Sequence, residues 1–116
     1  MKSIGVDIVE IDRVEKIISE FGDKFLKKVY SDEEIKYCKS KAKPSQHFAA
    51  RFAAKEAVAK ALGTGFGKDL MLKDVEVRND SNGKPMVYFK GIKNDKVLIS
   101  ISHCEHYVVA FAVLNK

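Results

Sequence analysis

Two carboxylates, Asp7 and Glu56, stand among apolar residues, where a charge is ordinarily costly. Asp7 lies in the alternating segment IGVDIVEI, on the predicted strand face that also carries Gly5 and Val9. Glu56 lies in FAAKEAVAKALGTG, a predicted helix with almost no polar face. The two could converge on a hard divalent ion such as Mg²⁺, which takes one or two protein carboxylates and completes its shell with waters and substrate phosphates.

Basic side chains accompany these carboxylates. Lys60 follows Glu56 by one helical turn, and Arg51 and Lys55 precede it in the same predicted helix. Such cations would complete a site for a phosphorylated substrate. A simpler interpretation stays open for each carboxylate. Glu56 and Lys60 would form a surface salt bridge of roughly 0.3–0.5 kcal/mol, and Asp7 would be a strand-end carboxylate held by a lysine or an arginine.

The elements that must position these side chains follow an α+β order: one N-terminal strand, three helices and then four mostly antiparallel strands. The first strand is predicted at residues 4–11. In the first helix, Asp12 is predicted to be the N-cap with Glu15 as its partner, and Gly22 to end the helix.

The second and third helices have their own boundary signals. Ser31 with Glu34 repeats the capping pattern, and the third helix is predicted from about Gln46 to Leu62. The alanines of the third helix gather on one arc, which allows a sheet or another helix to approach closely. The later strands are predicted at 75–78, 86–89, 97–102 and 107–114. An Asn-Gly turn separates the first two of them.

Length and composition narrow the class of protein. The chain has 116 residues and is expected to form a single domain over residues 1–116. Its formal net charge of +5 favours an acidic partner, such as nucleic acid, a phosphorylated ligand, an acidic protein or an anionic membrane. Acidic residues interrupt the N-terminal apolar segment, so no secretory leader is expected, and no apolar run approaches the ~20 residues that span a bilayer. With two cysteines, we expect a cytoplasmic protein with free thiols.

Two other patterns carry little weight. His103, Cys104 and His106 lack the spacing and the distant fourth ligand of a zinc site. GTGFGKD lacks the first glycine and the Ser or Thr of a Walker A loop. His47 and His106 are expected to be ordinary surface residues.

Four segments carry a resemblance to a known family. They are IGVDIVEIDRV at 4–14, RFAAKEAVAKALGTGFG at 51–67, NGKP at 82–85 and SISH at 100–103. Together they resemble the holo-[acyl-carrier-protein] synthase family, the small trimeric class of 4′-phosphopantetheinyl transferases. The motif F-x-x-K-E-x-x-x-K is specific when G-x-D lies near the N-terminus, as it does here. The match covers essentially the whole chain, in order.

The resemblance implies a reaction of fatty acid biosynthesis. Phosphopantetheine moves from coenzyme A to a serine hydroxyl of apo acyl carrier protein, and adenosine 3′,5′-bisphosphate leaves. Asp7 and Glu56 are then the Mg²⁺ ligands. Lys60 contacts the coenzyme A diphosphate and His103 lies near the phosphates, which completes the catalytic set. The larger two-lobed transferases carry D-x-E in the first metal segment, whereas Val9 stands at the third position here, as fits the small class.

The resemblance also implies partners. The coenzyme A-binding residues would be Arg51, Lys60, Asn82, Gly83, Lys84, Pro85 and His103. A basic and apolar first helix would dock the acidic carrier protein through Arg13, Lys16, Ile17 and Phe21. We therefore expect acyl carrier protein, coenzyme A and two further copies of the chain as partners, in a homotrimer with active sites between subunits, and neither nucleic acid nor a membrane.

A second class of function stays open on the residues alone. The positive charge also suits a non-catalytic basic binding module for nucleic acid or an acidic protein. However, the chain has no tryptophan, and its aromatic residues fall at core periods and not in a stacking pattern. A binding module also leaves Asp7 and Glu56 without a purpose.

Overall fold

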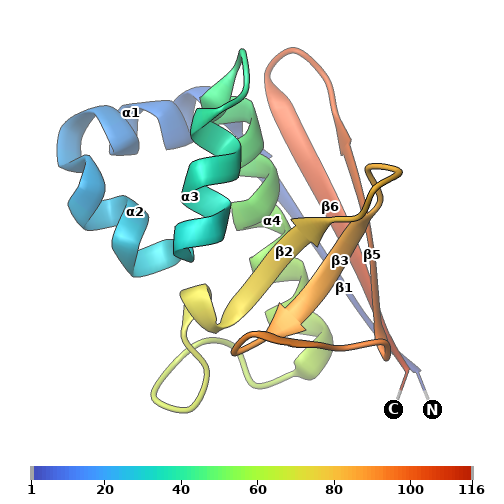
Figure 1. Cartoon of the computed structure of the whole chain (residues 1–116). Helices are drawn as coiled ribbons and strands as arrows, with labels where there is room; N and C mark the ends of the chain where they lie inside the picture. The colour runs from blue at the N-terminus through green and yellow to red at the C-terminus, as the bar shows by residue number, and fades with distance from the viewer. Residues whose placement is uncertain (1, 116) are drawn as a thin grey trace.

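The computed structural model describes residues 2–115, which form four α-helices, a short 3₁₀ helix and six strands (Figure 1). The first half contains β1 (Lys2–Glu10), α1 (Ile11–Phe21), α2 (Asp23–Val29), α3 (Asp32–Lys39) and α4 (Pro44–Leu62). The second half contains η1 (Leu72–Asp74), β2 (Val75–Asn79), β3 (Pro85–Phe89), β4 (Ile92–Lys93), β5 (Val97–His103) and β6 (Tyr107–Asn115). This order confirms the predicted α+β class, with α2 and β4 as additional elements.

The strands form two antiparallel sheets, in the orders β1-β6-β5 and β2-β3-β4. In Figure 1, α1, α2 and α3 lie on one side of α4, and the β1-β6-β5 sheet lies on the other. The hydrophobic core fills the space around α4, which buries residues on nearly every side. The sequence pattern predicts this property, since the helix has almost no polar face.

Small residues allow α4 to lie directly on the β1-β6-β5 sheet. Gly5 pairs with Ala112 in the register of β1 and β6, and the next inward pair is Asp7 with Ala110. The backbone of α4 at Ala57 and Ala61 approaches Gly5 so closely that a larger residue does not fit there. This contact brings the start of the chain against the middle of α4.

The opposite face of this sheet carries apolar side chains that are exposed in the single chain. They come from β1, β5 and β6 and comprise Ile4, Val6, Ile8, Leu98, Tyr107, Val109 and Phe111. The register places Val6 beside Phe111 and Ile8 beside Val109, so the residues form one continuous surface. We call it the apolar sheet face. An exposed patch of this kind marks an interaction surface.

The start of α1 differs from the prediction. The helix begins at Ile11, so Asp12 lies inside its first turn, and the N-cap is Glu10, whose side chain makes no capping hydrogen bond. The reason is that the backbone N–H of Ile11 still donates to His106 O at 2.9 Å. The strand ladder therefore runs directly into the helix and leaves no residue for a polar cap. The predicted end at Gly22 is confirmed, with its N–H donating to Ile18 O and a φ of 56°.

The other predicted boundaries agree closely with the structure. The capping box of Ser31 and Glu34 opens α3 with both reciprocal hydrogen bonds. α4 starts at Pro44, two residues before the predicted start, because proline suits the first turn of a helix. It ends at Gly63, which adopts the left-handed conformation at a φ of 82°. In residues 2–115, each helix is too short or too polar to cross a membrane.

Candidate active site

Asp7 and Glu56 line the same cavity, as the sequence predicts. The cavity has a volume of about 370 Å³ and lies between β1, α1, α2 and α4. Asp7 points to it from the inner face of β1, two residues after the close contact at Gly5. Glu56 points to it from α4, next to Ala57, which is the residue that Gly5 touches. The tight packing of strand on helix thus brings two carboxylates that are 49 positions apart to one place.

The two carboxylates influence each other electrostatically. Burial raises the pKa of Glu56 above its usual range, the nearby charge of Asp7 raises it further, and Lys60 lowers it. Two carboxylates that repel each other in a partly buried cavity need a cation between or beside them.

Lys60 supplies one such cation in the structure. Its Nζ lies 3.1 Å from Asp7 Oδ1 and donates to the backbone oxygen of Val6 at 3.0 Å. The simpler interpretation of Glu56, a surface salt bridge with Lys60, is therefore wrong, because Lys60 turns toward β1. The simpler interpretation of Asp7, a carboxylate held by a lysine, describes this contact, whereas Glu56 has no ion pair within residues 2–115.

The donor set fits a hard divalent ion with a partly open shell. Asp7 and Glu56 offer carboxylate oxygens, which suit Mg²⁺ better than the nitrogen and sulfur ligands of zinc. Groups of three or more His, Cys, Asp or Glu side chains that could hold a metal do not occur among the described residues. A divalent ion held by the two carboxylates of Asp7 and Glu56 would keep positions for waters or substrate oxygens.

The predicted coenzyme A-binding residues gather mostly around a second cavity of about 540 Å³. Its lining includes the predicted residues Arg51, Gly83, Lys84, Pro85 and His103. Asn82 is exposed in the same turn but does not line the cavity. Lys60 lies instead beside Asp7. Five of the seven predicted residues thus line the second cavity, and Lys60 and Asn82 do not.

Arg51 is the most constrained residue of the second cavity. It is 4% exposed, and its guanidinium carbon lies 4.2 Å from the centre of the Tyr37 ring. Its NH2 group donates to Asn79 Oδ1 at 2.8 Å, and Asn79 Nδ2 donates to Gly83 O at 2.9 Å. The Nε of Arg51 is buried and has no hydrogen-bond partner within residues 2–115. The turn before β3 is thereby held at a fixed position beside a buried cation.

Two histidines contribute to the second cavity. The Nε2 of His103 lies 3.2 Å from Gln46 Nε2, which joins the end of β5 to the start of α4. His47 also lines the cavity, with its ring edge-on to Tyr37. The expectation that His47 is an ordinary surface residue is therefore wrong. Burial, the charge of Arg51 and other nearby cations lower the pKa of His47.

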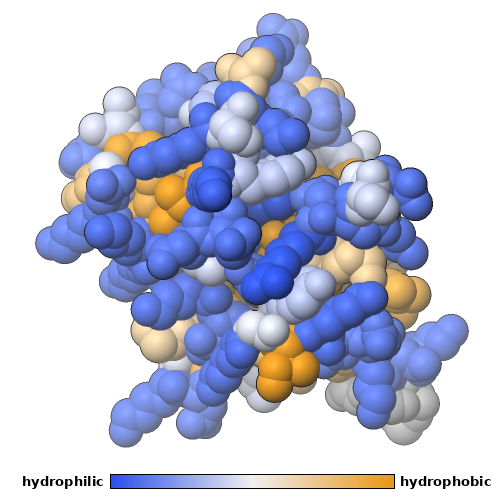
Figure 2. Space-filling view, in the orientation of Figure 1, coloured by the Kyte–Doolittle hydropathy of each residue, from blue (hydrophilic) through white to orange (hydrophobic). Residues whose placement is uncertain are grey.

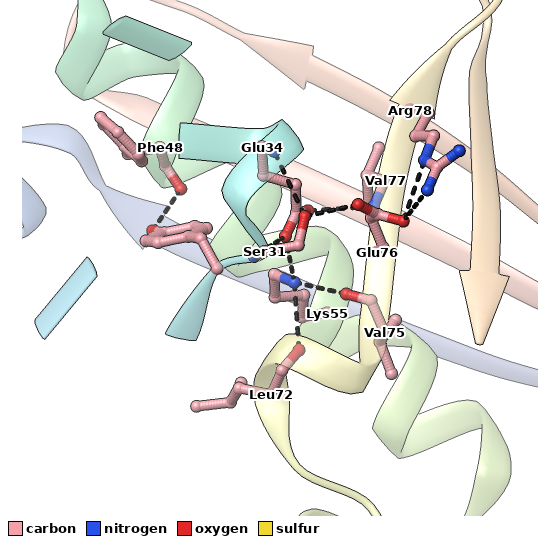
Figure 3. A network of polar contacts seen from close by, with 10 residues as sticks. Ser31, Glu34, Phe48, Lys55, Leu72, Val75, Glu76, Val77 and Arg78 are labelled. Carbon is pink, nitrogen blue, oxygen red and sulfur yellow. Dashed lines mark hydrogen bonds and ion pairs between the residues drawn. The ribbon is translucent and has the colours of Figure 1, made fainter. Parts of the chain in front are cut away.

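The remaining charge of α4, Lys55, belongs to a buried polar network that helical spacing alone does not predict (Figure 3). Its Nζ lies 2.7 Å from Glu34 Oε1 and also donates to the backbone oxygens of Leu72, at 3.0 Å, and Val75. Glu34 Oε2 in turn accepts from the backbone N–H of Val77 at 2.9 Å. Lys55 therefore fastens α4 to α3 and β2 and does not face either cavity.

The predicted docking residues lie along α1. Arg13 and Ile17 line the cavity of Asp7 and Glu56, whereas Lys16 and Phe21 are exposed on the same helix and do not line it. The surface in Figure 2 is largely hydrophilic, with an apolar patch over α1 and α2 at the left. Arg13 and Ile17 thus place one cation and one apolar side chain beside the carboxylates.

Comparison with known proteins identifies the family of the chain. Residues 3–112 match the family model described as the 4′-phosphopantetheinyl transferase superfamily. A holo-[acyl-carrier-protein] synthase of Protochlamydia amoebophila is 50% identical over 115 residues, which cover 95% of this chain and 94% of that protein. The enzyme of the same name from Thermodesulfovibrio yellowstonii is 51% identical over 115 residues and 99% of both chains.

Solved structures show the same architecture. The holo-[acyl-carrier-protein] synthase of Neisseria meningitidis is similar with a TM-score of 0.87 and 34% identity, over 98% of each chain. That of Bacillus anthracis, solved in complex with CoA (3′,5′-ADP), is similar with a TM-score of 0.84 and 40% identity, over 98% of this chain and 96% of the other. The converging carboxylates, the fold and the relatives agree: the chain belongs to the holo-[acyl-carrier-protein] synthase family of the 4′-phosphopantetheinyl transferase superfamily.

Proposed function

We propose that this chain transfers the 4′-phosphopantetheine group of coenzyme A to a serine of apo acyl carrier protein, as a cytoplasmic step of fatty acid biosynthesis. The serine oxygen forms a bond to the phosphorus next to pantetheine, and the bond from that phosphorus to the bridging diphosphate oxygen breaks. Adenosine 3′,5′-bisphosphate leaves with the electron pair of that bond. The observation that carries the proposal is the meeting of Asp7 and Glu56 in one cavity of a chain that is 50% identical to a named synthase.

Asp7 and Glu56 would hold Mg²⁺, which neutralises diphosphate charge when it is bound. Glu56 suits this task because its position beside Asp7 favours a bound cation over two free negative charges. Glu56 would also accept the serine proton, directly or through a water. Transfer of a phosphoryl-type group depends mainly on positioning and charge neutralisation, so a partly buried pair of ligands is well suited to it.

Basic residues would bind the phosphates of coenzyme A. Lys60 can leave Asp7 for the diphosphate, because its side chain is 54% exposed and flexible. Arg51 and His103, with the turn at Asn82, Gly83, Lys84 and Pro85, would hold the adenosine end. The support for this assignment is the fixed Arg51–Asn79–Gly83 connection and the His103 ring on the wall of the same cavity.

The carrier protein would dock on α1. Acyl carrier proteins are acidic, so Arg13 and Lys16 would attract the partner, while Ile17 and Phe21 would bury apolar area. Arg13 and Ile17 lie at the rim of the carboxylate cavity. A serine on the docked protein would therefore enter the cavity directly from this surface.

A homotrimer would complete the active site. The apolar sheet face gives a surface for contact between copies, and Ile8 and Val109 of this face share a hollow with His103. In a single chain, the cavity of Asp7 and Glu56 and the second cavity, which Arg51 lines, share no lining residue. Association through this face would place the adenosine cavity of one copy beside the carboxylates of the next.

The experiment that tests the function uses purified chain, apo acyl carrier protein, coenzyme A and Mg²⁺. Mass spectrometry of the carrier protein is expected to show the added phosphopantetheine, and EDTA is expected to abolish the addition. A carrier protein of unchanged mass, together with an electrophoretic shift of nucleic acid by the chain, would instead support a basic binding module.

A further inference from the structure

Lys60 occupies a position that has the character of a cation site. Its ammonium group lies 3.0 Å from the backbone oxygen of Val6 and 3.1 Å from Asp7 Oδ1. The Val6 oxygen can accept this bond because β1 is an edge strand, which within the described part of the chain pairs with β6 alone. A carbonyl and a carboxylate are oxygen ligands that serve hard cations as well as ammonium groups.

The Lys60 ammonium and a divalent ion would both bind the carboxylate of Asp7. Asp7 is the partner of Lys60, its side chain is 18% exposed, and it also lines the cavity with Glu56. A metal held by Asp7 and Glu56 would lie within a few ångströms of the Lys60 ammonium, and like charges at that distance repel. Metal binding therefore requires Lys60 to leave Asp7 or to tolerate this repulsion.

A bound diphosphate would change the charge balance at the carboxylate cavity. With both carboxylates ionised, Asp7, Glu56 and Lys60 together carry one negative charge, and a divalent ion makes the sum positive. A diphosphate that enters with the ion supplies negative charge. Its oxygens also give the Lys60 ammonium a new partner when the lysine leaves Asp7. The side chain is 54% exposed, so it has room to move between the two positions.

We propose that Lys60 competes with the divalent ion for Asp7, so that the metal binds weakly until a diphosphate draws the lysine away. This inference rests on the proposed metal site and adds a coupling between the metal and coenzyme A. Such coupling is reciprocal, because each ligand improves the binding of the other by the same factor. Lys60 thus carries part of the free energy that links the two binding events.

The test measures the affinity of the full chain for Mn²⁺, by electron paramagnetic resonance of the free ion, with and without coenzyme A. Lys60→Met removes the charge and keeps much of the length. It is expected to bind Mn²⁺ about tenfold more tightly than the wild type in the absence of coenzyme A, a typical size for coupled sites. Coenzyme A should then improve Mn²⁺ binding by a smaller factor in the variant than in the wild type.

Two controls sharpen the measurement. Lys93→Met is the first control, because it also removes one positive charge and an exposed ion pair, here with Asp95 at 3.6 Å. Lys93 lies outside the segments that form the site, so this variant should leave the affinity for Mn²⁺ unchanged. Lys60→Arg keeps the charge and should keep the weak binding. Wild-type affinity in Lys60→Met would overturn the competition while leaving the metal site intact. No Mn²⁺ binding by the wild type, even with coenzyme A, would overturn the metal site and the competition together.

Discussion

Gly5 and Ala57 are in such close contact that a methyl group on Gly5 would lie 2.0 Å from the backbone oxygen of Ala57. No flexible side chain is involved, so a larger residue at position 5 must push β1 away from α4. Because Asp7 and Glu56 are the neighbours of this contact, the glycine sets the separation of the two carboxylates. The motif G-x-D therefore has a physical basis in packing.

We predict that Gly5→Ala destabilises the fold by about 3 kcal/mol, at the upper end of typical overpacking costs. It should also reduce transfer activity in the fraction that stays folded, because the carboxylates move apart. Urea unfolding and the mass assay on the carrier protein measure the two effects. Gly67→Ala is the matched control, since Gly67 has open space around it and should tolerate alanine. Equal stability of the two variants would contradict the packing argument.

The buried pair of Lys55 and Glu34 provides a second prediction. Both side chains are fully buried, so Lys55→Met leaves the carboxylate of Glu34 without a counter-charge. Loss of one partner of a buried ion pair typically costs about 3–5 kcal/mol. The double variant Lys55→Met with Glu34→Gln removes both charges and should recover part of this loss. Denaturant unfolding measures the stability of Lys55→Met, Glu34→Gln and the double variant. If the stability losses of the two single variants simply add in the double variant, the two side chains are not coupled.

Stability at alkaline pH should depend on Cys38. Burial raises the pKa of this thiol from 9.0 to about 12. Between these values the unfolded thiol loses its proton while the folded thiol keeps it, so the unfolded state binds fewer protons. The free energy of unfolding therefore falls as pH rises, by at most about 1.4 kcal/mol per pH unit for one group.

Cys38→Ala should lack this part of the slope. Urea unfolding under reducing conditions from pH 8 to pH 11 compares the variant with the wild type. Cys104→Ala is a suitable control, because Cys104 is exposed and its replacement leaves the buried thiol of Cys38 in place. Parallel stability curves for Cys38→Ala and the wild type above pH 9 would contradict the prediction.

The position of Arg13 at the rim of the carboxylate cavity predicts a role in carrier-protein binding. Arg13→Ala should raise the KM for carrier protein several-fold, with little change in the KM for coenzyme A. It should also weaken the dependence of the carrier-protein KM on salt, because one attractive charge is lost. Lys73→Ala is a control, since Lys73 is an exposed lysine of η1 outside α1. A carrier-protein KM with unaltered salt response would remove α1 as the docking surface.

Local signals in the sequence predict much of the framework. The capping box of Ser31 and Glu34, the glycine ends at Gly22 and Gly63, and the almost wholly buried α4 all follow from patterns within one helix. The shared cavity of Asp7 and Glu56 could also be predicted, because each carboxylate lies among apolar residues of its own segment and needs a cation there.

Contacts between distant segments explain what the sequence does not predict. Helical spacing places Lys60 beside Glu56. In the structure, however, the Lys60 ammonium bonds to Asp7 of β1, which is 53 residues away in the sequence. Lys55 pairs with Glu34, 21 residues away, and a wheel shows no such partner. Asp12 fails as a cap because Ile11 continues the ladder to His106, a contact that exists only once β6 has paired with β1.

The most direct test of the account is the transfer rate of Glu56→Gln, which keeps the size of the side chain and removes its charge. Phosphopantetheine transfer to apo acyl carrier protein is measured by mass spectrometry with saturating Mg²⁺ and coenzyme A, and unfolding by urea confirms that the variant is folded. We predict that the variant retains native stability and loses transfer by at least about a hundredfold, as expected when charge stabilisation of the reacting phosphate is lost. A folded variant that turns over at the wild-type rate would contradict the central role of the paired carboxylates.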